Sequence, residues 1–175
     1  GLYGLSLVKF YDHDQQYRDI FASSNSVLLK DDEHSWIWLQ DGVIIKDHLY
    51  FLPMIINSDL SQPEGLQFRV LGVALFKTPL KDHMIHPEQA TMKMAPLLVD
   101  TKESQFLMGG AILANTISAG ANKPDGYIYI YGYKTTLGMR ELVCARVLEE
   151  NFEFFDDWRY FNGTTWVTEI SEATP

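Results

Sequence analysis

Two Asp-Gly pairs place carboxylates beside segments that favour strands, where a carboxyl group with a raised pKa can act as a general acid. Asp41 follows Trp36 and Trp38, whose rings could supply an apolar sugar platform and desolvate the carboxylate. Asp125 ends a short turn-like stretch. Because hydrolysis of a glycosidic bond needs two flanking carboxyl groups, Asp41 and Asp125 are the candidate catalytic residues. Asp-Gly is also a common turn pair, and a turn role is the simpler explanation of both.

Arg146 is a candidate ligand-binding residue, because it alternates with apolar residues in a segment that favours a buried strand. An arginine in that position needs a partner or an anionic ligand. A structural salt bridge to an acid nearby in the sequence is the simpler explanation. The acids available for it are Glu149, Glu150 and Asp157.

Two asparagines complete the candidate set. Asn25 and Asn115 each lie beside a predicted strand next to a small hydroxyl residue, so their amides could hydrogen-bond sugar hydroxyls or cap turns, and capping is favoured. The candidate substrate-binding residues are therefore Trp36, Trp38, Asn25, Asn115 and Arg146.

Metal and cofactor chemistry have little support. His83, His86 and Glu88 have a spacing that could bind zinc, but they fall in a loop-like stretch with no second pair of ligands. There is no glycine-rich phosphate loop and no nucleophile elbow. The single cysteine, Cys144, lies in an apolar stretch and is expected to be a small buried hydrophobe. We predict no metal and no cofactor.

Composition excludes several classes of partner. The 175 residues carry 14 basic and 23 acidic side chains, a net charge of −9. Nucleic acids and anionic membranes both require basic patches, so neither is an expected partner. No apolar run reaches the length of a transmembrane helix. The length suits one domain, which we place at 1–175.

Strand patterns dominate the chain. Alternating or continuous runs of β-branched and aromatic residues end at Gly, Asn, Asp or Pro. In 127–131 Tyr alternates strictly with Ile, so a strand would present a Tyr face, for which packing between blades is a simpler role than stacking on a ligand. The expected strands are 35–39, 42–46, 49–56, 67–77, 110–115, 126–133, 141–148 and 158–161. Helical turns are expected only at 14–22 and 151–157. The expected class is all-β.

The strands also appear in a repeated order. A glycine-led apolar strand, an aromatic strand and a strand containing Ala occur within about 25–80 and again within about 104–150, and a partial third unit starts at about 158. Antiparallel units side by side are typical of β-propeller blades. The expected fold is a segment of a β-propeller, and a compact β-sandwich is the alternative.

The same residues resemble a known group. Trp36–Gly42, Asp125–Gly132 and Arg140–Val147 resemble blade motifs of five-bladed propeller proteins related to glycoside hydrolase family 43, in particular domain of unknown function 4185. The chain lacks that group's early Gly-Asp-Thr stretch, so the resemblance implies an interior piece of a longer propeller.

The resemblance implies a carbohydrate-active protein that performs acid/base hydrolysis of a glycosidic bond, with Asp41 as the carboxylate supplied by this segment. The alternative is a non-catalytic sugar-binding or scaffold propeller module. The expected partner is carbohydrate, and the implied location is extracellular or periplasmic. Self-association through unpaired blade edges is a further expectation.

Overall fold

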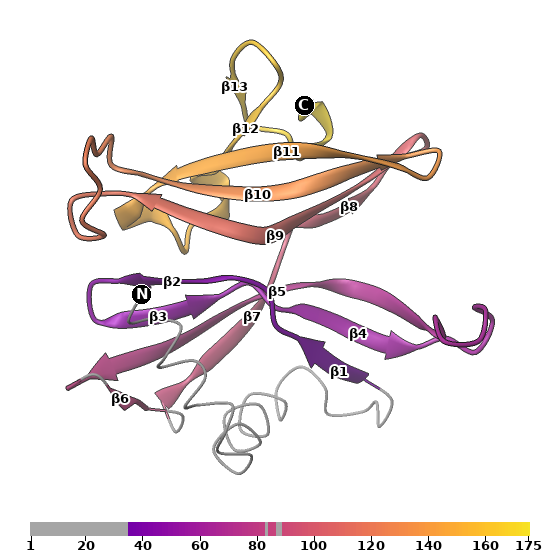
Figure 1. Cartoon of the computed structure of the whole chain (residues 1–175), viewed down its shortest axis with the longest axis horizontal. Helices are drawn as coiled ribbons and strands as arrows, with labels where there is room; N and C mark the ends of the chain where they lie inside the picture. The colour runs from indigo at the N-terminus through magenta and orange to yellow at the C-terminus, as the bar shows by residue number, and fades with distance from the viewer. Residues whose placement is uncertain (1–34, 83, 87–88) are drawn as a thin grey trace.

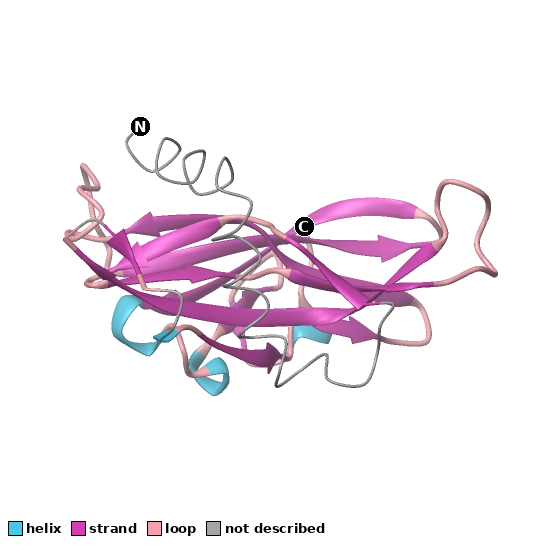
Figure 2. Ribbon diagram, turned by 90° about the horizontal axis from the view of Figure 1, so that it is seen from below, coloured by secondary structure: helices cyan, strands magenta, loops and turns pink. Residues whose placement is uncertain are grey.

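The computed structural model describes residues 35–82, 84–86 and 89–175, and these form two antiparallel β-sheets stacked as layers (Figure 1). Three short 3-10 helices complete the regular structure of the described part: η2 (Glu149–Asn151), η3 (Phe155–Asp157) and η4 (Ile170–Glu172). In the view of Figure 2 the strands run mainly along the length of the molecule, and the helical turns lie at its periphery. The expected all-β, antiparallel class is confirmed.

The first sheet is built on one long hairpin. Strand β1 pairs with β4, and β2 pairs with β3, so 35–45 and 48–58 lie antiparallel with a break near 39–41 and 52–53. Strand β5 pairs with β3 and β4 along one edge and with β7 along the other. The strands are β1 (Ser35–Trp38), β2 (Gly42–Ile45), β3 (His48–Phe51), β4 (Met54–Ser58), β5 (Phe68–Lys81), β6 (Met84–Ile85) and β7 (Thr91–Ala95).

The second sheet is a meander in which each strand pairs with the next along the chain. Its centre is the hairpin of β10 and β11, in register from Tyr127 opposite Leu148 to Thr136 opposite Met139. A β-bulge interrupts the pairing of β9 with β10 between Tyr131 and Gly132. The strands are β8 (Leu98–Asp100), β9 (Ser104–Asn115), β10 (Tyr127–Thr136), β11 (Met139–Leu148), β12 (Arg159–Phe161) and β13 (Trp166–Val167).

The main hydrophobic core lies between the sheets, because side chains from both meet in one buried cluster. Strand alternation sends Ile128 and Ile130 of β10 into this cluster, where both are fully buried, and leaves the neighbouring tyrosines on the outer face. Trp158 closes one end of the core, and its indole N–H donates to the Phe152 carbonyl at 3.1 Å. A smaller cluster around Phe51 and Phe76 lies on the other face of the first sheet.

The expected strands match the structure except in extent. The expected run 49–56 is divided into β3 and β4, since Leu52 and Pro53 separate them. Strand β9 begins at Ser104, six residues before its expected start, and the strands β6, β7, β8 and β13 were not expected. The first repeat corresponds to β2, β3 and β5, and the second to β9, β10 and β11, which are neighbouring strands in each sheet. Two stacked antiparallel sheets are consistent with a propeller segment and with a sandwich.

Within the described ranges, no helix combines the length and the apolar character that a membrane crossing requires. The expected helical turn at 14–22 lies outside the described residues.

Candidate functional site

An arginine held between two aromatic rings marks the outer face of the second sheet. The Arg146 guanidinium carbon lies 4.2 Å from the centre of the Tyr127 ring and 4.1 Å from that of Trp166. The rings of Tyr129 and Phe161 flank Trp166, at 6.1 and 5.3 Å between centroids. A cation over an aromatic face is attracted by the ring quadrupole, so the stack is favourable without a carboxylate partner.

A chain of hydrogen bonds extends from this stack. The Tyr129 hydroxyl donates to the Asp125 carboxylate at 2.6 Å, and the Tyr127 backbone N–H donates to the same carboxylate at 3.0 Å. The Asn115 side chain also acts to lower the pKa of Asp125, and Arg146 acts to lower that of Tyr129. Burial opposes ionisation of Asp125, but the hydrogen bonds outweigh it and hold the pKa of Asp125 below its usual value. Burial, followed by the bond to Asp125, raises the pKa of Tyr129.

Local structure explains why these residues meet. Gly126 has a φ of +84°, which suits glycine and turns the chain into β10 directly after Asp125. Tyr129 then lies opposite Arg146 on β11, which places the two side chains on the same face. Trp166 arrives from β13, where Phe161 and Trp166 are paired. We refer to Asn115, Asp125, Tyr127, Tyr129, Arg146 and Trp166 as the aromatic-arginine cluster.

Three of the sequence-based candidates, Asn115, Asp125 and Arg146, are thus brought together. The salt bridge expected for Arg146 is wrong, because the ion pairs that the described residues form are Lys77 with Glu153 and His48 with Asp47. Cys144 is half-buried on the same strand, and burial raises the pKa of its thiol to about 11.

Asp41 lies elsewhere and has structural contacts. Its carboxylate is exposed and accepts hydrogen bonds from the backbone N–H groups of Gly42, at 2.9 Å, and Ile112, at 2.8 Å. The second bond joins the first sheet to β9. Trp38 is 37% exposed and packs edge-on against Phe68, with centroids 4.5 Å apart.

Four of the other sequence-based candidates have no described side chain, whereas His86 is described and half-buried. Trp36 lies in β1, but its side chain is not among those that the structure describes. Asn25, His83 and Glu88 lie outside the described residues altogether. Within the described part of the chain, no three potential metal ligands gather into one group.

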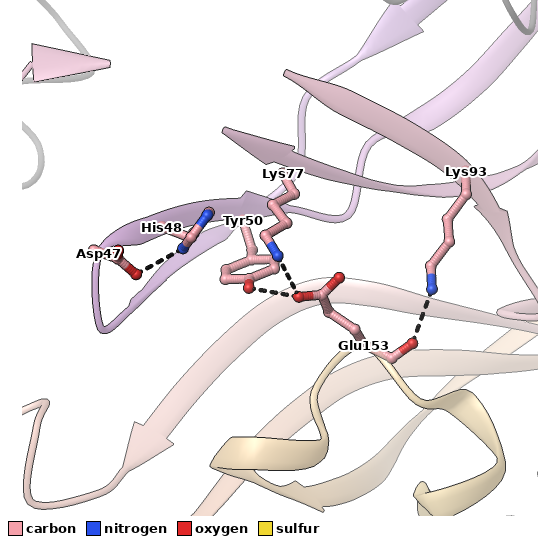
Figure 3. Close-up of polar contacts among 6 residues, drawn as sticks. All are labelled: Asp47, His48, Tyr50, Lys77, Lys93 and Glu153. Atoms are coloured by element: carbon pink, nitrogen blue, oxygen red, sulfur yellow. Dashed lines mark hydrogen bonds and ion pairs between the residues drawn. The ribbon is translucent and has the colours of Figure 1, made fainter. Parts of the chain in front are cut away.

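A second polar site, which the sequence did not indicate, lies between the sheets (Figure 3). The Glu153 carboxylate accepts from the Tyr50 hydroxyl at 2.8 Å and from Lys77 Nζ at 2.7 Å. Lys93 Nζ donates to the Glu153 backbone carbonyl at 2.9 Å. His48 bonds Asp47 at 2.8 Å beside these groups. Glu153 follows η2 in the chain, whereas its partners come from β3, β5 and β7.

These groups border an open hollow of about 140 Å³, lined by Asp47, His48, Tyr50, Glu153 and neighbouring residues. Burial opposes ionisation of Glu153, but the hydrogen bonds from Lys77 and Tyr50 dominate and lower its pKa. Burial and the bond to Glu153 raise the pKa of Tyr50. Near neutral pH a carboxylate with a lowered pKa stays ionised and a phenol with a raised pKa stays neutral. Because neither group changes its protonation state, the arrangement suits a structural contact between the sheets better than proton transfer.

The model of the family described as Domain of unknown function (DUF5005) matches residues 6–174. The chain belongs to this family. Comparison with curated proteins gives no match. The DUF5005 description names no activity, so the resemblance to propellers related to glycoside hydrolase family 43 stays a prediction.

Sequence reasoning missed two parts of the sites in this DUF5005 domain. Trp166 could have been noticed as an aromatic residue shortly after a turn-like Asn-Gly pair, but its position over Arg146 depends on the β12–β13 pairing. Glu153 gave no signal, because its partners lie 60 to 103 residues away in the chain.

Proposed function

We propose that this DUF5005 domain is a non-catalytic carbohydrate-binding module that holds a glycan on the aromatic-arginine cluster. The observation that supports the proposal is the gathering of three polar binding candidates with three aromatic side chains on one outward face. Asp125, Asn115 and Arg146 supply acceptors and donors, and Tyr127, Tyr129 and Trp166 supply rings.

The chemistry of the face suits sugars. A sugar ring presents C–H groups on its faces and hydroxyls around its edge, so it binds where an aromatic side chain lies beside planar polar groups. Tyr129 offers both a ring and a polar group, since its ring adjoins Trp166 and its hydroxyl donates to the Asp125 carboxylate. All the cluster's aromatic side chains are partly exposed, so part of each can contact a ligand.

Glycosidic hydrolysis has weaker support from the same geometry. Catalysis requires a carboxyl group with a raised pKa facing a second one. Asp125 has a lowered pKa, and the Asp41 carboxylate is exposed and bonded by two backbone N–H groups. Incubation with any glycan that binds, with reducing ends measured over time, should give no product. Product formation that Asp41→Asn abolishes would instead establish the hydrolase function.

The binding proposal is tested by affinity electrophoresis and calorimetry with a panel of soluble polysaccharides. Trp166→Ala should lower the affinity at least about tenfold, since loss of an aromatic ring from a sugar site removes stacking and packing together. Trp38→Ala is the matched control, because it removes a partly exposed tryptophan from the first sheet, and it should bind as the wild type does. Equal binding by both variants, or no binding across the panel, would contradict the proposal.

Three related expectations remain proposals alongside it. Glycan binding fits an extracellular or periplasmic location. Closure of the two sheets into a five-bladed propeller would need further blades, and the terminal strands β8 and β13 of the second sheet offer edges for self-association. Light scattering tests the last of these: a mass of about 20 kDa at all concentrations would exclude self-association.

A further inference from the structure

Arg146 carries a charge that no carboxylate within the described residues neutralises directly. Neither of the ion pairs formed by those residues includes it. Its contacts are the rings of Tyr127 and Trp166, and Tyr129 lies opposite it on β10. Arg159 lies directly opposite it on β12, which adds a second positive charge on this face. The Arg159 guanidinium donates to two backbone carbonyls, and among the described residues it also forms no ion pair with a carboxylate.

Arg146 also has an unused donor. Its Nε is buried and has no hydrogen-bond partner, and it is the only side-chain nitrogen or oxygen of the described part in that condition. Buried donors in native proteins are nearly always paired, so an unpaired one calls for an explanation. An uncompensated charge and an unpaired donor on the same guanidinium point to the same missing partner, a planar anion.

We propose that Arg146 binds the anionic group of an acidic glycan, a carboxylate of a uronic acid or a sulfate ester. This inference rests on the proposed carbohydrate-binding function and specifies the class of sugar. The oxygens of either anion can accept in parallel from Nε and a terminal nitrogen of the guanidinium, in the side-on geometry that arginine favours. A neutral sugar can fill the aromatic face but leaves the charge of Arg146 without a counter-ion.

The position of Trp166 explains how the anion reaches a buried donor. Both faces of the guanidinium are covered, one by Tyr127 and the other by Trp166, so only its edge remains for a ligand. Trp166 belongs to β13, the terminal strand of the sheet, which is held to β12 by two residue pairs. The proposal therefore requires a small displacement of this short strand to uncover the Nε edge.

The groups facing Arg146 are compatible with an anion. Asp125 is the acid of the cluster, and its carboxylate accepts hydrogen bonds from the Tyr129 hydroxyl and the Tyr127 backbone N–H, which spread its charge. Glu149, nearby in the sequence, is bonded by Ser118 and Thr116 instead. The net charge of −9 limits which anions can bind. A polyanion that makes no contacts through the faces of sugar rings would be repelled by the protein.

The test compares acidic glycans with their neutralised forms. Oligogalacturonate is compared with its methyl ester, and a sulfated galactan with its desulfated form, each by calorimetry. One acidic form should bind about tenfold or more tightly than its neutral counterpart, the scale of a charge-assisted pair of hydrogen bonds. Which pair shows the difference separates carboxylate from sulfate. NMR of the Arg146 Nε–H in the wild type should show a downfield shift with that ligand alone.

Two variants separate the effect of the positive charge of Arg146 from that of the planar shape of its guanidinium. Arg146→Lys keeps the charge but loses the planar fork, so it should lose most of the preference for the acidic glycan. Arg140→Met is the matched control, since Arg140 stacks on Tyr133 of the same hairpin at 4.4 Å, and it should keep the preference.

The outcomes distinguish the two proposals. Equal affinity for acidic and neutral forms, with no change of the Nε resonance, overturns the role of Arg146 and leaves sugar binding intact. No binding of any glycan overturns both. The NMR measurement needs no variant, so a failure of Arg146→Lys to fold does not prevent a decision.

Discussion

Replacing Glu153 by Ala should weaken the contact between the two sheets more than replacing any other exposed or half-exposed acid of the same turn. The side chain connects η2 on the second sheet with Tyr50 and Lys77 of the first, through contacts of 2.8 and 2.7 Å (Figure 3). Alanine removes both contacts and leaves the Tyr50 hydroxyl, on a residue only 5% exposed, without its acceptor. The bond from Lys93 to the residue 153 backbone carbonyl remains, so the sheets keep this polar contact and their apolar packing at this end of the core.

The magnitude follows from the exposure of each partner. A buried hydroxyl left unpaired costs about 1–3 kcal/mol, and the hollow beside Tyr50 admits water, which favours the lower half of that range. The side chains of Lys77 and Glu153 are 29% and 35% exposed, so solvent screens their ion pair and its loss adds only about 0–1 kcal/mol. We expect Glu153→Ala to lower the free energy of unfolding by about 1–3 kcal/mol.

Urea denaturation measures this change. With an m-value of about 2 kcal/mol per molar, a loss of about 2 kcal/mol lowers the midpoint by about 1 M. Glu150→Ala is the matched control, because Glu150 is an exposed acid of the same turn, and it should change stability by less than about 0.5 kcal/mol. In a double-mutant cycle with Tyr50→Phe, the coupling energy should be about 1 kcal/mol.

Equal stability of Glu153→Ala and Glu150→Ala would refute the proposed role of Glu153 in joining the two sheets. A coupling energy near zero between Glu153 and Tyr50 would refute it as well. Such a result would mean that water replaces both contacts without loss.

The contribution of Glu153 and Tyr50 to stability also depends on pH, and its direction follows from their shifted pKa values. The pKa of Glu153 is lowered in the folded state, so its contribution to stability is present above the ordinary value of 4.5 and is lost as the pH falls through the folded pKa. The pKa of Tyr50 is raised, so its contribution is present below the ordinary value of 10.0 and is lost as the pH rises above it. The stability difference between wild type and Glu153→Gln should therefore be constant near neutral pH and shrink below about pH 4.5.

Three further substitutions or reactions test other parts of the structure. Gly132→Ala should destabilise the protein by about 2 kcal/mol or more in urea denaturation, because an added Cβ would overlap the Leu107 carbonyl oxygen and the backbone of β9 at the bulge. Asp41→Ala should cost about 1 kcal/mol in the same assay and should expose the Ile112 amide to faster hydrogen exchange, because its 2.8 Å bond is lost. Cys144, with a thiol pKa of about 11, should react with iodoacetamide at pH 8 at less than about a tenth of the rate of free cysteine.

The sequence was sufficient for the fold class because strand alternation is a local property. The Tyr-Ile alternation of 127–131 alone predicts a strand with an aromatic face and an aliphatic face, and Ile128 and Ile130 are fully buried as that predicts. The role of Asp41 could not be predicted in the same way. Its contact with Ile112 joins residues 71 apart in the chain, and only the stacking of the two sheets brings them together.

Arg146 shows most clearly why nearness in the sequence does not identify the partner of a side chain at the site. Three acids follow it closely, and a salt bridge was the natural expectation, but the chain leaves β11 at Leu148 and enters η2. The Glu149 backbone N–H then bonds the Gly126 carbonyl, and its carboxylate turns toward Thr116 and Ser118. Arg146 is left among aromatic rings because the strand ends before an acid can reach its face. An anionic partner for Arg146 must therefore come from outside the described part of the chain.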